Sequence, residues 1–280
     1  VRPQKHFGTL LYTGNGSSGH RISGLEFKPD FAWVKRRDSG ANHGIYDSVT
    51  GVTSYLRADL NNAQDTNLSH LSSFNEDGFT LGADTYQNTN SATYVAWCWK
   101  AGGAAVSNTN GDITSSVSAN QESGFSIVTY TGNGNSPQTI GHGLGKAPSW
   151  VIVKDRDNSM DWVVKHKNSS SNKILYLQTD SAEDTGTGSN NGIIDNLTSA
   201  TATTVTLTNN GSGNMNMVNK SSTDYVMYCW AEIPGFSKFG TYTGNGSSNG
   251  PFIHLGFRPA WFMQKKTSGT GGWYIFDSKR

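Results

Sequence analysis

The chain has 280 residues, of which 34% are hydrophobic and 11% aromatic, and its formal net charge is +1. This length suffices for two or three small domains, and the aromatic content excludes a disordered polar chain. Without a block of like charges, we expect no binding to nucleic acid or to an anionic membrane. No apolar run approaches the roughly 20 residues of a membrane helix, so we expect no membrane insertion.

A five-residue motif, Tyr-Thr-Gly-Asn-Gly, occurs three times, at Tyr12–Gly16, Tyr130–Gly134 and Tyr242–Gly246. A Pro follows the Tyr of each copy after 17 or 18 residues and opens an apolar run that ends in Lys. Such fixed spacing indicates repeated structural units. We therefore divide the chain into a leader (1–5), repeat one (6–103), a Ser/Asn/Gly-rich linker (104–123), repeat two (124–235) and an incomplete repeat three (236–280). Because the start is neither a Met nor a signal peptide, we expect a piece of a longer polypeptide.

Repeat one contains short segments typical of strands, separated by Gly, Asn, Asp and Ser, and no sustained helical period. One turn of helix could fit within Ala58–Thr66. The sequence therefore predicts an all-β fold of antiparallel, jelly-roll-like sandwich domains in tandem. The expected strands of repeat one are Phe7–Tyr12, Arg21–Leu25, Asp30–Arg36, Gly44–Asp47, Ser54–Leu60, Phe79–Gly82 and Tyr94–Lys100.

The strand opened by Pro29 has two apolar faces of different size. Phe31 and Trp33 fall on one face, and Ala32 and Val34 fall on the other. The other two repeats show the same alternation. Because large groups recur on the first face, we expect that face to form the sandwich interior, with the strand in the centre of its sheet.

Repeats two and three depart from repeat one. Repeat two carries extra residues within Thr185–Tyr225, where a loop insertion could collect binding variability or simply lengthen a solvated hairpin. Repeat three lacks counterparts of Ser54–Leu60 and Tyr94–Lys100. Half a sandwich leaves strand edges open, so we expect that the native chain continues or that another chain completes this repeat.

Cys98 and Cys229 occupy the same place in repeats one and two. If each repeat folds by itself, these residues cannot pair, so we expect two small buried hydrophobic side chains. The absence of disulfides fits assembly in a reducing cytoplasm.

Two motifs have the spacing of ligand-binding loops. Gly14–Gly19 matches Gly-x-Gly-x-x-Gly after a strand, but no helix follows, so a turn is the better interpretation. Asp155–Asp161 has the alternating oxygens of a calcium loop, yet it lacks the central Gly and has His166 in place of the final Glu. A polar hairpin turn is the alternative, and we predict no metal and no cofactor.

The remaining polar residues give no catalytic signature. The His residues lack metal-site spacing, and His142 and His254 precede the Pro-initiated strand, where a structural role in a turn is expected. No hydrolase, phosphate-loop or zinc-protease motif occurs, and no acid pair stands out, so we expect no enzyme. The basic runs Lys35–Arg37 and Lys265–Lys266 suit a solvated rim.

Trp162 and Trp273 lie fourteen residues after their Pro, with His43 as their counterpart in repeat one. An indole face suits the apolar face of a pyranose, so both Trp residues are candidate sugar-binding platforms. A recurring register is equally expected of core residues, which is the alternative.

As a set, the motifs resemble a repeated domain of unknown function found in tail-fibre and other structural proteins of tailed bacteriophages, especially those of marine bacteria and cyanobacteria. The resemblance covers nearly the whole chain apart from the linker. The segments that carry it are Ser73–Gly82, Tyr94–Lys100, Gly124–Gly134, Ile140–Pro148, Phe236–Gly246, Gly250–Pro259 and Phe276–Lys279.

The resemblance implies a virion component, such as a tail fibre or adhesive appendage that recognises host-surface polysaccharide without covalent chemistry. Its partners would be other copies of itself and other virion proteins, and assembly would take place in the bacterial cytoplasm. The alternative is a purely structural spacer, or a capsid or tail decoration, without a ligand. A polysaccharide depolymerase is a third possibility. The family supplies no catalytic residues.

Overall fold

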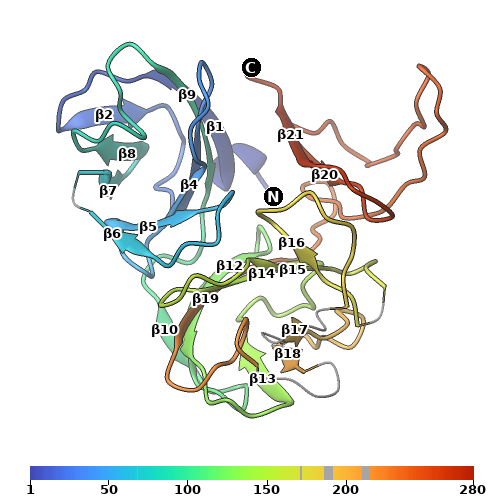
Figure 1. The fold of residues 1–280 in the computed structure, drawn as a ribbon. Coiled ribbons are helices and arrows are strands. Elements are labelled where there is room, and N and C mark those ends of the chain that lie inside the picture. The colour runs from blue at the N-terminus through green and yellow to red at the C-terminus, as the bar shows by residue number, and fades with distance from the viewer. Residues whose placement is uncertain (68, 171, 186–191, 210–214) are drawn as a thin grey trace.

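The computed structural model describes residues 1–67, 69–170, 172–185, 192–209 and 215–280. The described chain forms five antiparallel sheets, and its one helical element is a short 3-10 turn, η1 (Pro3–Lys5), within the leader. Two sandwiches and a separate hairpin form three units, which meet at the centre of the molecule (Figure 1). The predicted all-β fold is therefore confirmed. No helix in the described ranges is long and apolar enough to cross a membrane.

Unit one (residues 6–103) is a sandwich of a six-stranded and a three-stranded sheet. The six-stranded sheet has the order β1-β9-β3-β4-β5-β6, formed by Phe7–Thr13, Thr93–Trp99, Phe31–Arg36, Gly44–Asp47, Ser54–Arg57 and Asp65–Thr66. The three-stranded sheet has the order β2-β8-β7, formed by His20–Ser23, Gly78–Leu81 and Leu71–Asn75. The helical turn expected within Ala58–Thr66 is wrong, because turns and β6 occupy this segment.

Unit two (residues 104–235) repeats this design with a seven-stranded sheet. Its order is β10-β11-β12-β19-β14-β15-β16, formed by Val106–Asn108, Ser115–Asn120, Phe125–Thr131, Asp224–Trp230, Trp150–Asp155, Val163–His166 and Leu175–Tyr176. The facing sheet has the order β13-β18-β17, formed by Gln138–Gly141, Thr204–Thr208 and Ile193–Ile194.

The sequence predicted a linker over residues 104–123, and this prediction is wrong. They contribute β10 and β11 to the edge of the large sheet, and Val117 is buried in its core. The segment is rich in Ser and Asn, yet it alternates, so that Ser115 and Val117 face inward while Ser116 is only half-buried. Composition suggested a linker, but the period-two alternation was the informative signal.

The large sheets of units one and two share their strand order and their register. In each sheet, the strand that carries the Cys (β9 or β19) is central. It pairs on one side with the motif strand and on the other with the Pro-initiated strand. The Pro-initiated strands β3 and β14 also have neighbours on both edges, which confirms their predicted central position. The pairs at one end are Trp99 with Phe7 and Phe31, and Trp230 with Phe125 and Trp150.

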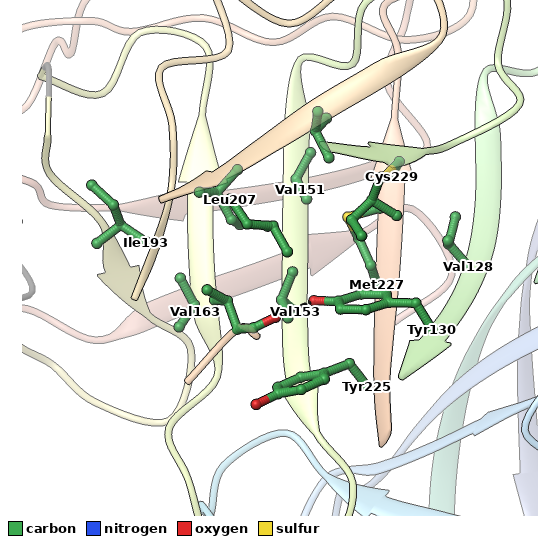
Figure 2. Packing of buried hydrophobic residues seen from close by; sticks show 14 of the residues in the cluster. Val128, Tyr130, Val151, Val153, Val163, Ile193, Leu207, Tyr225, Met227 and Cys229 are labelled. Atoms are coloured by element: carbon green, nitrogen blue, oxygen red, sulfur yellow. Dashed lines mark hydrogen bonds between the residues drawn. The ribbon is translucent and has the colours of Figure 1, made fainter. Parts of the chain in front are cut away.

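The sandwich interiors use the opposite face of the Pro-initiated strand from the one predicted. In unit one, Ala32 and Val34 face the interior, and in unit two Val151 and Val153 do so. Figure 2 shows Val151, Val153 and Met227 on the face of the large sheet that is turned toward Leu207 of β18. The period-two pattern identifies two faces, but both are buried, so the size of the side chains does not tell which layer covers which face.

The larger face forms a second core, which we call the central cluster. It lies between the units and contains buried aromatic groups from both sandwiches, packed against half-buried side chains of unit three. This location explains why the largest apolar groups recur at fixed positions: they join units. Its members include Phe31, Trp33, Trp97, Trp99, Phe125, Trp150, Ile152, Trp162, Tyr228 and Trp230, with Trp261, Met263, Trp273 and Ile275 at its edge.

The three units contact one another in a cyclic order. At every junction, the first residue of the apolar run in one unit meets a Phe on the motif segment of the next unit. Unit one thus contacts unit two, two contacts three and three returns to one. The Phe of units one and two lies five residues before the motif Tyr, whereas Phe239 lies three residues before it. The ring pairs are Phe31–Phe125 at 5.7 Å, Trp150–Phe239 at 6.5 Å and Trp261–Phe7 at 6.4 Å.

Unit three (residues 236–280) contains one hairpin, β20 (Trp261–Lys265) and β21 (Trp273–Asp277). Trp261 and Met263 pack against the central cluster, as their counterparts in the other units do. The opposite face carries Phe262, which is 40% exposed. The hairpin therefore docks through its larger face and leaves its smaller face uncovered by described residues.

Candidate functional site

Trp162 lies between units one and two and is completely buried. Its Nε1–H donates to the carbonyl oxygens of Arg57 (2.8 Å) and Leu60 (3.1 Å) of unit one. A sugar-stacking platform needs an accessible ring face. The ligand-binding prediction for Trp162 is therefore wrong, and the alternative of a core residue is confirmed.

Trp273 makes the equivalent contact at the next junction. Its Nε1–H donates to the carbonyl oxygen of Tyr176 in unit two (2.9 Å), and its half-buried ring packs against the central cluster. Arg57 and Tyr176 hold equivalent places, because they pair with the residues directly after His43 and Trp162, respectively. Trp273 thus serves in a junction between units two and three, where its ring packs against protein and is not free as a sugar platform.

His43, the counterpart in unit one, is held by an internal contact. It accepts a hydrogen bond from Nε1 of Trp33 on its Nδ1, at 3.0 Å. Burial, and secondarily the charge of Lys35, lowers the pKa of His43 to about 4. The imidazole is therefore neutral at pH 7 and carries its proton on Nε2.

A second pair of hydrogen bonds crosses the junctions. The hydroxyl of Tyr228 in unit two donates to Oδ2 of Asp47 in unit one (2.7 Å). Nε1 of the equivalent Trp97 in unit one donates to Oδ2 of Asp277 in unit three (3.1 Å). Both bonds run from the central strand of one unit to the end of the Pro-strand hairpin of its neighbour. Equivalent polar contacts therefore fix the orientation of two successive junctions.

The Tyr-Thr-Gly-Asn-Gly motif is a structural clamp rather than a phosphate loop. In unit one, the completely buried Asn88 accepts from the backbone N–H of Asn15 (2.9 Å) and donates to its side chain (3.2 Å). Asn219 makes the same two contacts with Asn133 in unit two, at 3.0 Å each. No helix follows the motif in these units, so the turn interpretation is confirmed.

Glycine is required in this clamp by close packing. A Cβ at Gly14 would lie 2.2 Å from the carbonyl oxygen of Thr89, and one at Gly132 would lie 2.2 Å from that of Lys220. Such distances are far below van der Waals contact. These motif glycines therefore mark the positions where another segment of the chain packs directly against the turn.

The segment Asp155–Asp161 forms the polar connection between β14 and β15. Oδ1 of Asp155 accepts from the backbone N–H groups of Asp157 (2.9 Å) and Asn158 (2.8 Å). Asp161 accepts from Gln178 (2.7 Å), so these carboxylates are engaged with protein donors. Among the described residues, no three His, Cys, Asp or Glu side chains gather as metal ligands would. The hairpin-turn interpretation accounts for this segment.

The other candidate polar residues are structural as well. His142 is buried in the turn before β14, where its Nδ1 accepts from the backbone N–H of Leu144 (3.3 Å). Cys98 and Cys229 are free and completely buried, and burial raises the pKa of both thiols. The predictions for these Cys residues and for His142 are confirmed, whereas His254 lies in an exposed segment without regular secondary structure.

The insertion within Thr185–Tyr225 lies partly outside the described residues. Its described part includes β17 and β18, which are joined by residues 195–203, whereas β7 and β8 of unit one are joined by residues 76–77. A longer hairpin therefore accounts for part of the insertion. Thr201 organises its tip by accepting the backbone N–H of Thr204 (2.8 Å).

Unit one has a buried polar cluster that the sequence analysis missed. Nδ1 of His70 lies 2.7 Å from Oδ2 of Asp84, and the ring of Tyr55 lies 4.6 Å from that of His70. His70 is 2% exposed and Asp84 8% exposed, so the pair is closed to a substrate. In unit two, the buried Ile174 takes the place of Tyr55, because each precedes the Leu that pairs with the neighbouring strand.

A polar cleft of about 570 Å³ lies between units one and two. Nε2 of His6 is 3.4 Å from Oε1 of Glu122, and its Nδ1 is 2.9 Å from Nδ2 of Asn120. The cleft was not predicted, because one wall belongs to residues 104–123. Its wall offers hydrogen-bond donors and acceptors and charges of both signs. The side chains that line it include His6, Lys28, Lys100, Asn120, Gln121 and Glu122.

Comparisons with known proteins give one family and no named relative. Neither the curated proteins nor the solved structures contain a match to this chain. One family model, described as a domain of unknown function (DUF7483), matches residues 2–280. The match spans all three units, and the chain therefore belongs to the DUF7483 family.

Proposed function

We propose that the chain is a structural component of a bacteriophage virion, in a tail fibre or another appendage, and that it has no enzymatic activity. The observation that best supports this proposal is the central cluster. It joins the three units through aromatic contacts at each junction and through hydrogen bonds between units. A fibre module must keep its shape under load, and a shared core resists bending better than a flexible linker does. The sequence resemblance to phage structural proteins supports the same function.

The features that recur between the units are consistent with this role. The motif turns clamp strands, the large aromatic residues join units, and the buried His and Cys residues sit in packed interiors. Partners would be further copies and other virion proteins, and assembly would occur in the bacterial cytoplasm. Virions of the encoding phage, purified by density gradient, test the proposal through mass spectrometry and immunogold microscopy. We expect gold particles on an appendage, and absence of the chain from intact virions would contradict it.

The polar cleft between units one and two supports a second candidate function, non-covalent recognition of a host glycan. Lys100, Gln121 and Glu122 offer donors and acceptors at its wall, and multiple copies on a fibre would raise a weak affinity by about 10² or more. A glycan array with labelled protein and unlabelled competitor tests this function. A saturable signal that Glu122→Ala removes and the distant Lys279→Ala retains would establish an adhesin. If no glycan gives a signal and the protein is present on virions, only the structural role remains.

A depolymerase is the less favoured alternative. The same glycans, incubated with the chain in solution, should keep their viscosity. A progressive loss of viscosity would contradict the proposal of a non-catalytic protein.

A further inference from the structure

The outer face of the β20–β21 hairpin corresponds to interior faces of the other units. Phe262, Tyr274 and Phe276 are 40%, 54% and 52% exposed. Their counterparts in units one and two, such as Val151 and Tyr46, have no exposed surface. An aromatic face this open on a soluble domain marks a surface that another segment covers.

The edge of β20 is also open. Within the described ranges β20 pairs only with β21, whereas β3 and β14 each pair with a second strand, β9 or β19. The indole Nε1–H of Trp261 on β20 is buried and has no hydrogen-bond partner. A buried donor without an acceptor is costly, and the backbone edge of β20 is open to an added strand.

The third copy of the motif lacks the partners that its glycines serve elsewhere. A Cβ at Gly14 or Gly132 would collide with the carbonyl of a covering segment, but a Cβ at Gly244 would meet nothing within 4 Å. Gly244 also needs no left-handed backbone conformation. Nothing in the described chain therefore explains why this position is glycine.

The motif tyrosine shows the same difference. Tyr12 stacks on Tyr94 at 4.9 Å and Tyr130 stacks on Tyr225 at 5.2 Å, each next to the central strand of its sheet. Tyr242 is 48% exposed, and its hydroxyl donates to the side chain of Gln264 on β20 (2.7 Å). The clamp of unit three is thus preformed beside β20, without the segment that the clamps of the other units hold.

We propose that unit three binds one extended polypeptide segment from outside residues 1–280, which adds as a strand to the open edge of β20 and passes over Gly244. The two complete units define the chemistry of this segment. It carries Asn six residues before Tyr, followed by Val, any residue, Trp or Tyr, Cys and Trp. The Asn enters the clamp, the Tyr stacks on Tyr242, and the last Trp packs at Trp261. The two templates are Asn88–Trp99 and Asn219–Trp230.

A second copy of this chain is not the expected occupant. The chain's own segments of this pattern end in β9 and β19, and each of these strands already pairs on both edges. Releasing either one would open a sandwich interior. The occupant therefore comes from a segment that is not already part of such a sheet.

The test uses the full 280-residue protein and a labelled synthetic peptide with the sequence of residues 218–231, carrying Cys229→Ser to prevent oxidation. Fluorescence anisotropy should show saturable binding, and hydrogen exchange should slow in residues 239–243 and 261–265. A peptide that also carries Asn219→Ala and Tyr225→Ala should bind at least about tenfold more weakly, since both clamp contacts are lost.

Gly244→Ala is the decisive protein variant. It should fold and melt like the parent, because its Cβ meets nothing, yet bind the peptide at least about tenfold more weakly through a clash with the docked carbonyl. Gly240→Ala is the matched control, since Gly240 also has free space and an ordinary backbone conformation, and it should bind normally.

Three results would overturn the proposal. One is equal binding of a scrambled peptide, and another is unchanged binding by Gly244→Ala. The third is a concentration-dependent dimer in sedimentation that Gly244→Ala abolishes, because a second copy would then be the occupant. None of these results depends on whether the chain is found on virions.

Discussion

The hairpins β14–β15 and β20–β21 have the same sequence pattern but different surroundings. Each places its larger face in the central cluster, through Trp150 and Ile152 in one case and Trp261 and Met263 in the other. The smaller face is sealed beneath a second sheet in unit two and is exposed in unit three. The comparison teaches that joining units and closing a sandwich are separate tasks, performed by opposite faces of one strand.

Removing the buried ring at the first junction should have the largest effect on stability. Trp162→Ala should lower the free energy of unfolding by about 4 kcal/mol, because it leaves a cavity and removes the indole donor from the carbonyl oxygens of Arg57 and Leu60. Trp273→Ala should cost clearly less, since its ring is only half-buried. Urea unfolding of both variants measures the difference. Equal costs would mean that the two junctions do not differ in the way their burial indicates.

Acid should destabilise unit two through His142, which has no exposed surface. Burial lowers the pKa of this His to about 4, although its contact with Thr201 acts in the opposite direction. As the pH falls, His142 is protonated in the unfolded chain before it is protonated in the folded one. Its contribution to the free energy of unfolding is therefore fully present above about pH 6.5 and falls by about 3 kcal/mol toward pH 4.

Burial raises the pKa of Asp47 and works against this trend, so the measurement is the difference between parent and His142→Gln across that window. Unfolding by urea at several pH values should give a flatter profile for the variant. Parallel profiles would show that His142 does not titrate with folding.

The motif glycines should separate the closed clamp from the open one. Gly132→Ala should cost about 2 kcal/mol or more, because its Cβ would lie 2.2 Å from the carbonyl oxygen of Lys220. Gly244→Ala should change stability by no more than about 0.5 kcal/mol. Thermal unfolding of the two variants side by side checks both values. A large loss for Gly244→Ala would indicate that its clamp is already closed.

The smallest effect is expected on the outer face of the hairpin. Phe262→Ala should change the free energy of unfolding by less than about 0.5 kcal/mol, because the ring is 40% exposed. The equivalent Val151→Ala should cost about 1.5–2 kcal/mol, since Val151 is completely buried. If Phe262→Ala proved as costly as Val151→Ala, the two faces would not differ as described.

Local signals predicted most of the strands. The bounds of β3 and β4 were predicted to within one residue, because period-two alternation and turn residues are signals that depend only on neighbouring positions. β7 and β11 were missed, since Ser and Asn in their sequences suggested loops. In β11 the alternation from Ser115 to Val117 was the better signal, whereas in β7 a bulge between Leu71 and Ser73 breaks the period-two pattern.

The roles of the large aromatic residues could not be predicted from spacing. A ring that recurs at a fixed register can be exposed, buried within one sandwich or buried between two, and only the packing of distant segments decides. Trp162 is buried by Arg57 and Leu60, which lie about a hundred positions earlier in the chain. The polar cleft at His6 and Glu122 was missed for the same reason.

The cyclic order of the junctions limits how such units can multiply. A contact whose two sides differ can propagate without end as a helical filament, or it can return to its starting point and close. Here the ring contact closes after three steps, when Trp261 of the last unit meets Phe7 of the first. The surface that would recruit a fourth unit is thereby consumed within the trio. A polypeptide made of many such units would grow as a string of separate three-membered blocks, and not as a continuous spiral.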